Sequence, residues 1–410
     1  MPRRHHRDLF SARCFFVSFA ALSEAVLLLS PASSSRQSRP ATPAERPDPQ
    51  AWFVQGQAAL QANDLAAAEA AFRRVLSVDP SSGAAYANLG VVAMRRKEWD
   101  HALSLLQKAE QLAPQMAGIR LNIGLVKYRR GDYAGAIAPL SSVVHEQPAS
   151  QQARYLLGLC HLFTEHYADA VTALAPLWPQ MSNDFTYLYV LSIAAHNAQN
   201  AALDEQAMTR LLDIGGDTPE FHLILGKAYL NREETDKAVS ELELAAGADS
   251  RLPYVHFSLG VAYVRKDDAA RAEAEFKKDI AVEPDLPDNY EQLGLLYLQQ
   301  QKDGEAEQAF RQALHYNPRQ AGSLLELGRL YRRAGKNREA LAELDAAEKL
   351  IPENQSVHFV RGQVLLRLGR RAEAQAELAT AKKLLDASLN KQREKYGEPV
   401  PNPELKQTQP

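Results

Sequence analysis

The chain has 410 residues, and its 47 Lys or Arg are nearly balanced by 50 Asp or Glu. Nucleic-acid-binding domains usually carry a basic patch and a high pI, so this balance argues against a nucleic-acid partner. Hydrophobic residues make up 46% of the chain and aromatic residues only 8%, and alternating Val/Ile/Thr-rich runs are missing. That composition is typical of packed helices, so we predict an all-α protein.

Residues 1–32 have the pattern of a targeting segment. Three arginines lie among the first seven residues, 14–29 is largely apolar, and small residues follow at 30–32. We predict a cleaved signal peptide, and therefore a periplasmic or secreted protein. An uncleaved membrane anchor is the alternative, but a spanning helix needs about 20 apolar residues, and Glu24 interrupts this run.

Residues 33–48 follow as a stretch rich in Ser, Pro and Arg, without apolar periodicity. Such a stretch cannot bury enough apolar surface to offset the entropy of ordering it, so we predict a disordered linker.

A period of 34 residues organises the chain from 49 to 388. Steps of 34 from Gly294 reach glycine at nine of ten positions, and Ser192 is the exception. The same steps from Ala306 reach alanine at nine of ten positions, where Asp204 is the exception. Prolines recur in the same register at 80, 114, 148, 284, 318 and 352. We therefore predict ten copies of one structural unit.

The segment 289–318 is the clearest copy. It carries two apolar stripes at helical spacing, which are separated by the polar run 300–304. The stripes consist of Tyr290, Leu293, Gly294 and Tyr297, and then Ala306, Ala309, Phe310 and Ala313. Each unit is therefore predicted to be a helix hairpin, with Gly and Ala where the two helices approach closely.

These columns resemble the tetratricopeptide repeat, whose signature combines Leu-Gly, Tyr, Ala, Phe and Pro at a 34-residue period. Leu89-Gly90, Tyr297 and Phe310 are matching examples in this chain. The resemblance implies an α-solenoid of antiparallel helix hairpins that forms a right-handed superhelix. It also implies a protein-binding scaffold that holds a peptide or partner protein on its concave surface.

The pattern weakens in the middle of the chain. Pro139 falls inside a predicted second helix, which it should kink or shorten by a turn, and Pro176 and Pro179 should do the same in the next repeat. The fifth repeat holds both exceptions, Ser192 and Asp204. Segment 139–218 is interpreted either as tolerated drift or as a hinge in the solenoid.

No phosphate loop, HExxH or CxxC motif is found in the sequence, so we predict a non-enzymatic protein without metal or cofactor. Cys160 occupies a column that is apolar in every other repeat, which predicts a small core residue. His222, His256 and His358 share a column with Tyr86 and Tyr290, and we predict that they pack as rings instead of acting as ligands.

By the resemblance, one face of the first helices lines the concave surface. There we predict an apolar docking groove in repeats two to five and a basic stretch in repeats nine and ten; the alternative is that the apolar residues only fill the inner wall. The predicted contact residues are Met94, Leu125, Tyr128, Tyr155, Leu159, Phe163, Tyr189, Ile193, Arg329 and Arg332.

The predicted partner is a protein or peptide, with no small-molecule substrate, and the predicted role lies in envelope or secretion-related assembly. A self-associating structural protein and a regulatory or accessory subunit of an enzyme complex are the alternatives. Residues 389–410 are predicted to form a polar helical extension followed by a disordered tail.

Overall fold

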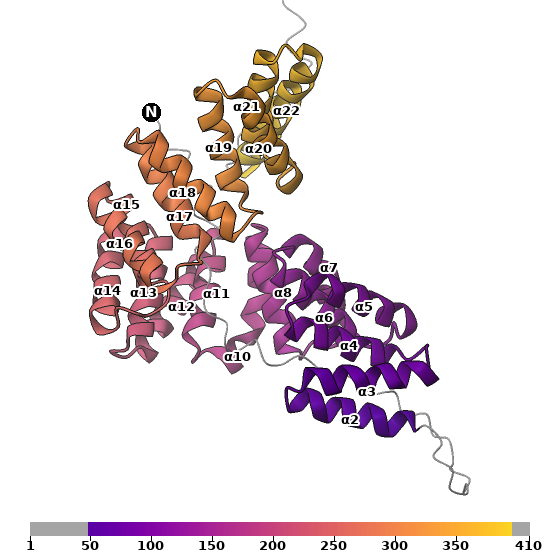
Figure 1. The fold of residues 1–410 in the computed structure, drawn as a ribbon. Helices are drawn as coiled ribbons and strands as arrows, with labels where there is room; N and C mark the ends of the chain where they lie inside the picture. The colour runs from indigo at the N-terminus through magenta and orange to yellow at the C-terminus, as the bar shows by residue number, and fades with distance from the viewer. Residues whose placement is uncertain (1–47, 396–410) are drawn as a thin grey trace, which may run out of the picture. The chain divides into compact units, whose positions relative to one another are not determined.

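A computed structural model describes residues 48–395, and within this range the ordered elements are helices joined by short turns (Figure 1). The chain divides into two compact units, Met1–Glu234 and Thr235–Pro410, which we call unit 1 and unit 2. Within residues 48–395 no helix is long and apolar enough to cross a membrane. The predicted signal peptide, almost all of the linker and the last fifteen residues lie outside the described part.

Unit 1 begins with α2, whose first turn is capped by Asp48: one carboxylate oxygen accepts from the amides of Gln50 and Ala51 at 3.0 and 3.2 Å. Its helices are α2 (Pro49–Gln61), α3 (Leu65–Val78), α4 (Gly83–Arg95), α5 (Trp99–Leu112), α6 (Ala117–Arg129), α7 (Tyr133–Glu146), α8 (Gln151–Phe163), α9 (Tyr167–Leu174), the 3-10 turn η1 (Ala175–Leu177), α10 (Trp178–Met181), α11 (Phe185–Asn197), α12 (Ala201–Ile214) and α13 (Pro219–Asn231).

Unit 2 continues the same alternation of first and second helices. Its helices are α14 (Thr235–Ala248), α15 (Val255–Arg265), α16 (Ala269–Val282), α17 (Pro287–Gln299), α18 (Asp303–Tyr316), α19 (Ala321–Arg333), α20 (Asn337–Leu350), α21 (Gln355–Arg367) and α22 (Arg371–Lys395). The helix α22 extends past the predicted end of the repeats at residue 388.

The glycine and alanine columns lie inside the hairpins, as the sequence predicts. A Cβ atom added to Gly294 would lie 2.6 Å from the Phe310 ring, and one added to Gly90 would lie 2.7 Å from Leu106. All nine alanines of the second column are fully buried. The glycine therefore makes room for a large side chain of the second helix. The prediction of an all-α array of antiparallel hairpins is confirmed, whereas the right-handed superhelix stays a prediction.

Each hairpin turn contains one residue with left-handed backbone, a column that the sequence reasoning missed. The ten residues recur every 34 positions with φ between 57° and 78°, and only Gly131, Gly335 and Gly369 among them are glycine. At Gln301 the φ is 61°, and the next amide, of Lys302, donates to the Tyr297 carbonyl at 2.9 Å. This geometry ends the first helix, and it is the one glycine adopts without strain.

We expect Gln301→Gly to raise the free energy of unfolding by about 1 kcal/mol, because a side chain in left-handed backbone costs that order of energy. Urea denaturation followed by circular dichroism measures the change. Gln300→Gly is the matched control: Gln300 has φ −83°, so glycine there should destabilise. A Gln301→Gly variant less stable than the wild type would contradict this account.

Pro139, Pro176 and Pro179 affect the helices that contain them in different ways. At Pro139 the predicted loss of a turn is wrong, because α7 keeps fourteen residues, and the alternative of a kink stays a prediction. Proline at this position cannot donate to the Gly135 carbonyl, and the Lys127 ammonium donates to that carbonyl instead, at 3.0 Å. At Pro176 and Pro179 the prediction is confirmed, since the second helix of the repeat is divided into α9, η1 and α10. The hinge in 139–218 stays a prediction.

Candidate partner-binding surface

The apolar part of the predicted contact set is mostly buried. Six side chains are at most 5% exposed: Met94, Leu125, Tyr155, Leu159, Tyr189 and Ile193. The predicted open groove is therefore corrected at these positions, because neighbouring side chains cover them. At Tyr189, for example, the hydroxyl accepts from the Asn231 amide of α13 at 3.1 Å, and the Lys227 ammonium lies 5.6 Å from the ring centroid.

The structure brings two other predicted residues together with one that was not predicted. Tyr128 of α6, Tyr133 of α7 and Phe163 of α8 form an aromatic cluster, in which the Tyr133 and Phe163 rings stack at 4.4 Å. The Tyr128 ring lies 5.5 Å from Tyr133 and 6.2 Å from Phe163. Burial, with Tyr133 beside it, raises the pKa of Tyr128. The three side chains are half-buried and join three consecutive helices.

The basic part of the predicted set is more accessible. Arg329 and Arg332 of α19 are half-buried, and Arg333 of α19 and Arg367 of α21 are exposed. We call these four residues the arginine cluster. One guanidinium nitrogen of Arg367 donates to the Arg332 carbonyl at 2.5 Å, which holds the two adjacent first helices together.

Two members of the arginine cluster have acidic neighbours. Arg329 pairs with Glu326 at 2.6 Å, and Arg333 pairs with Asp303 at 2.8 Å. Among the residues that the structure describes, no carboxylate lies within ion-pair distance of Arg332 or Arg367. Partial burial and the charges of its three arginine neighbours lower the pKa of Arg332. An added anion would relieve this repulsion.

The fifth repeat contains a buried polar network where other repeats have glycine and alanine. The Ser192 hydroxyl of α11 donates to Asp204 of α12 at 2.7 Å, and both side chains are buried. The other Asp204 oxygen lies 3.1 Å from His196 Nδ1, and Arg232 donates to Asp204 at 3.2 Å. Ser192 and Asp204 are the exceptions in the glycine and alanine columns, and both fall in the fifth repeat, twelve residues apart. This coincidence is the feature of the sequence that indicates a pair.

The candidates for reactive chemistry have structural roles. Cys160 is fully buried, and burial followed by the charge of Asp132 raises the pKa of its thiol to about 12. A thiol with that pKa is almost entirely protonated at neutral pH and is a poor nucleophile. The prediction of a core residue is confirmed. No group of three or more potential metal ligands occurs in the described residues.

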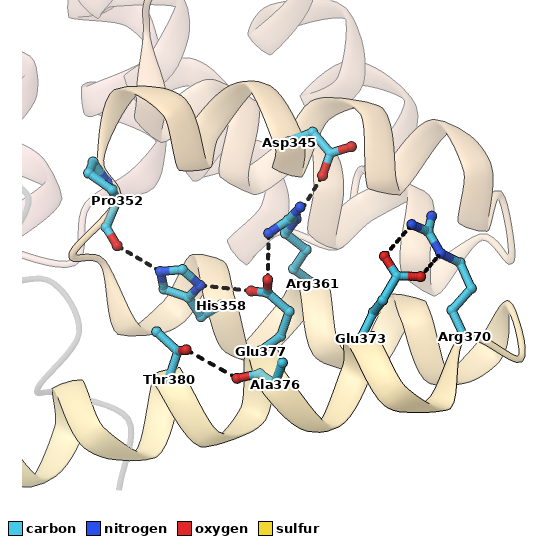
Figure 2. A network of polar contacts seen from close by, with 9 residues as sticks. All are labelled: Asp345, Pro352, His358, Arg361, Arg370, Glu373, Ala376, Glu377 and Thr380. Atoms are coloured by element: carbon cyan, nitrogen blue, oxygen red, sulfur yellow. Dashed lines mark hydrogen bonds and ion pairs between the residues drawn. The ribbon is translucent and has the colours of Figure 1, made fainter.

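The column histidines do more than pack. His358 of α21 lies between two acceptors: Nδ1 is 2.7 Å from Glu377 of α22 and Nε2 is 2.7 Å from the Pro352 carbonyl (Figure 2). His256 of α15 has equivalent contacts, at 2.6 Å to Glu275 and 3.0 Å to the Ser250 carbonyl. The prediction of packing rings missed these contacts, because it considered only the column shared with tyrosine.

Tandem hairpins with small residues at the helix crossings define the chain as a tetratricopeptide-repeat protein, a class of protein–protein interaction scaffolds. Two tetratricopeptide repeat models match residues 45–117 and 127–192. The chain belongs to the family described as the cilia and flagella-associated protein 70 C-terminal domain, whose model matches residues 180–396, just over half of the chain.

Three solved structures are similar in part. MamA protein matches at 19% identity with a TM-score of 0.38, covering 46% of this chain and 100% of that one. Yeast Tom70 matches at 15% identity with a TM-score of 0.40, and the match covers 82% of this chain and 85% of that one. The Cut9–Hcn1 hetero-tetramer of APC/C matches at 11% identity with a TM-score of 0.37, and the match covers 82% of this chain and 87% of that one. We draw no functional conclusion from likenesses this distant. No curated protein matches the chain.

Proposed function

We propose that the chain is a non-enzymatic scaffold that binds an extended, acidic segment of a partner protein at the arginine cluster. The observation that carries this proposal is the position of Arg332 and Arg367 on adjacent first helices without a carboxylate partner among the described residues. The six buried apolar residues offer no comparable surface. The half-buried aromatic cluster remains a second, apolar contact.

The chemistry of the partner follows from the guanidinium groups. A planar guanidinium binds a carboxylate through two parallel hydrogen bonds, and desolvated charges make such bonds stronger. Because Arg332 and Arg367 come from successive repeats, one chain that crosses both helices can place successive acidic side chains on them. A strongly basic or uncharged segment has no equivalent set of contacts here.

We expect a fluorescein-labelled hexaglutamate peptide to bind the protein, and Arg332→Glu with Arg367→Glu to weaken that binding at least about tenfold. Each lost tenfold corresponds to about 1.4 kcal/mol of binding free energy. Fluorescence anisotropy measures the dissociation constant, and added salt should weaken binding by screening. Hexalysine and hexaglutamine peptides are the ligand controls.

The matched protein control is Arg338→Glu, which reverses the charge of an exposed arginine of α20 that is not a member of the cluster. It should bind hexaglutamate as the wild type does. Equal binding by the double variant, or binding of hexalysine as tightly as hexaglutamate, would rule out the acidic-segment proposal.

The proposed cellular setting is envelope or secretion-related assembly after export. Its support is the basic and apolar pattern of residues 1–32. N-terminal sequencing of the protein from its own cells, together with protease protection, tests the placement: an intact N-terminus on a chain shielded inside the cell would contradict it.

A further inference from the structure

The first helix of the last hairpin has an apolar face that is uncovered in the described structure. On α21, Phe359 is 44% exposed and Leu366 is 47% exposed. They are seven positions apart, almost two helical turns, so they lie on one stripe with Gln363 between them. We call Phe359, Gln363 and Leu366 the terminal face.

The column of Phe359 is covered in the earlier repeats of unit 2, whereas one repeat earlier the columns of Gln363 and Leu366 hold the half-buried Arg329 and Arg332. One repeat apart, the column of Phe359 holds Phe257, Glu291 and Leu325, which are at most 8% exposed. Each is covered by the next first helix: Glu291 of α17, for instance, accepts from the Ser323 hydroxyl of α19 at 2.8 Å. Phe359 therefore lies where the next first helix stacks in the earlier repeats, and it is not an isolated exposed hydrophobic residue.

The final second helix cannot cover this face, because it packs on another side of α21. Gly362 of α21 faces Leu378 of α22, and His358 contacts Glu377 of α22 (Figure 2). Residues 396–410 contain only Tyr396, Val400 and Leu405 as large apolar residues. They supply less apolar surface than a complete first helix does.

We propose that the terminal face binds the same face of a second copy of this chain, with the two α21 helices antiparallel about a two-fold axis. In this arrangement Phe359 contacts Leu366 of the second copy and Leu366 contacts Phe359, while the two Gln363 amides meet at the axis. Such an isologous contact closes on itself and gives a dimer.

The charges beside the terminal face favour the antiparallel arrangement. Glu353 precedes α21, whereas Arg367, Arg370 and Arg371 lie at or after its end. Antiparallel helices bring the acidic start of each toward the basic end of the other, and they also oppose the helix dipoles. Parallel helices would place arginine beside arginine, which is unfavourable.

Sedimentation velocity of the full chain, purified in the form its own cells produce, tests the proposal. We expect a concentration-dependent dimer, and we expect Phe359→Glu to raise its dissociation constant at least about tenfold. Leu244→Glu is the matched control, because Leu244 of α14 is 51% exposed and lies outside the terminal face. Circular dichroism checks that each variant is folded, and Leu366→Glu is a second variant of the same face.

Cross-linking tests the two-fold axis itself. A Gln363→Cys variant should form an intermolecular disulfide under mild oxidation, because residues at the axis bring their own Cβ atoms together. Phe359→Cys should form far less, since it lies opposite Leu366. A monomer at every concentration, a dimer that Phe359→Glu leaves intact, or an open-ended polymer would each overturn the proposal.

Discussion

Asp204→Ala is expected to lower the free energy of unfolding by about 3 kcal/mol, although it restores the alanine found in the other nine repeats. The reason is the network around Asp204, whose two oxygens contact Ser192 at 2.7 Å, His196 at 3.1 Å and Arg232 at 3.2 Å. Removing one partner from a buried network leaves the remaining polar groups without a hydrogen-bond partner. The free-energy cost of that loss exceeds the net stabilisation that the intact network provides. Urea denaturation measures the change.

A double variant makes this prediction specific. Ser192→Gly together with Asp204→Ala restores both columns, so no hydroxyl is left buried without its acceptor, and most of the lost stability should return. The two substitutions are therefore expected to be strongly non-additive. Asp213→Ala is the control, since Asp213 is an exposed residue of the same helix and should change stability by less than about 0.5 kcal/mol. Additive losses would show that Ser192 and Asp204 are not coupled.

The second large effect is expected at Glu377, where Glu377→Gln should cost about 3 kcal/mol at mildly acidic pH. Glu377 accepts from His358 at 2.7 Å and from Arg361 at 2.6 Å, and Arg361 also contacts Asp345 at 2.7 Å (Figure 2). Loss of this negative charge leaves a largely buried imidazolium facing only neutral acceptors, the Pro352 carbonyl and the amide oxygen of the substituted side chain. Breaking a buried ion pair by removing one partner costs energy of that order.

The pH dependence has a definite sign. Burial lowers the pKa of His358, but the Pro352 carbonyl, the Glu377 carboxylate and the more distant charge of Glu348 together outweigh burial and raise the pKa. Because the pKa of His358 is raised in the folded state, protonated His358 stabilises the fold fully at pH values below the pKa of unfolded histidine, about 6.5. This stabilisation is lost as the pH rises through the folded pKa.

The cost of Glu377→Gln should therefore shrink at alkaline pH, although Arg361 keeps part of it. Urea titrations of the wild type and the variant across this pH range measure the difference. The control is Glu373→Gln on the same helix: Glu373 pairs with Arg370 at the surface, so its loss should change stability little at any pH. A cost that is independent of pH would contradict an imidazolium at His358.

The regular and the irregular repeats have different roles. Glu377 and the arginine cluster lie in the regular repeats of unit 2, where the sequence predicted basic contact residues. Asp204 lies in the least regular repeat, within the segment that the sequence analysis interprets either as tolerated drift or as a hinge. The structure shows that Ser192 and Asp204 compensate for each other across one hairpin, which makes them a structural pair.

The sequence alone determined the helix hairpin, its length and its number of copies. It could do so because the crossing of two helices requires small residues at fixed positions, so that Gly294 facing Phe310 and its equivalents recur every 34 residues. Pro176 and Pro179 broke their helix as predicted, because the missing amide acts locally. At Pro139 the helix persisted, since Lys127 from the neighbouring helix reached the carbonyl that lacked a donor.

Only the tertiary structure decided which side chains face solvent. Helical periodicity places Tyr155, Tyr189 and Phe359 in the same column, yet Tyr155 and Tyr189 are at most 2% exposed and Phe359 is 44% exposed. The difference comes from whether another first helix packs on that column, and a helix's own sequence does not record its neighbour's position. Burial in a repeat array is a property of the contact between units, whereas the hairpin is a property of each unit.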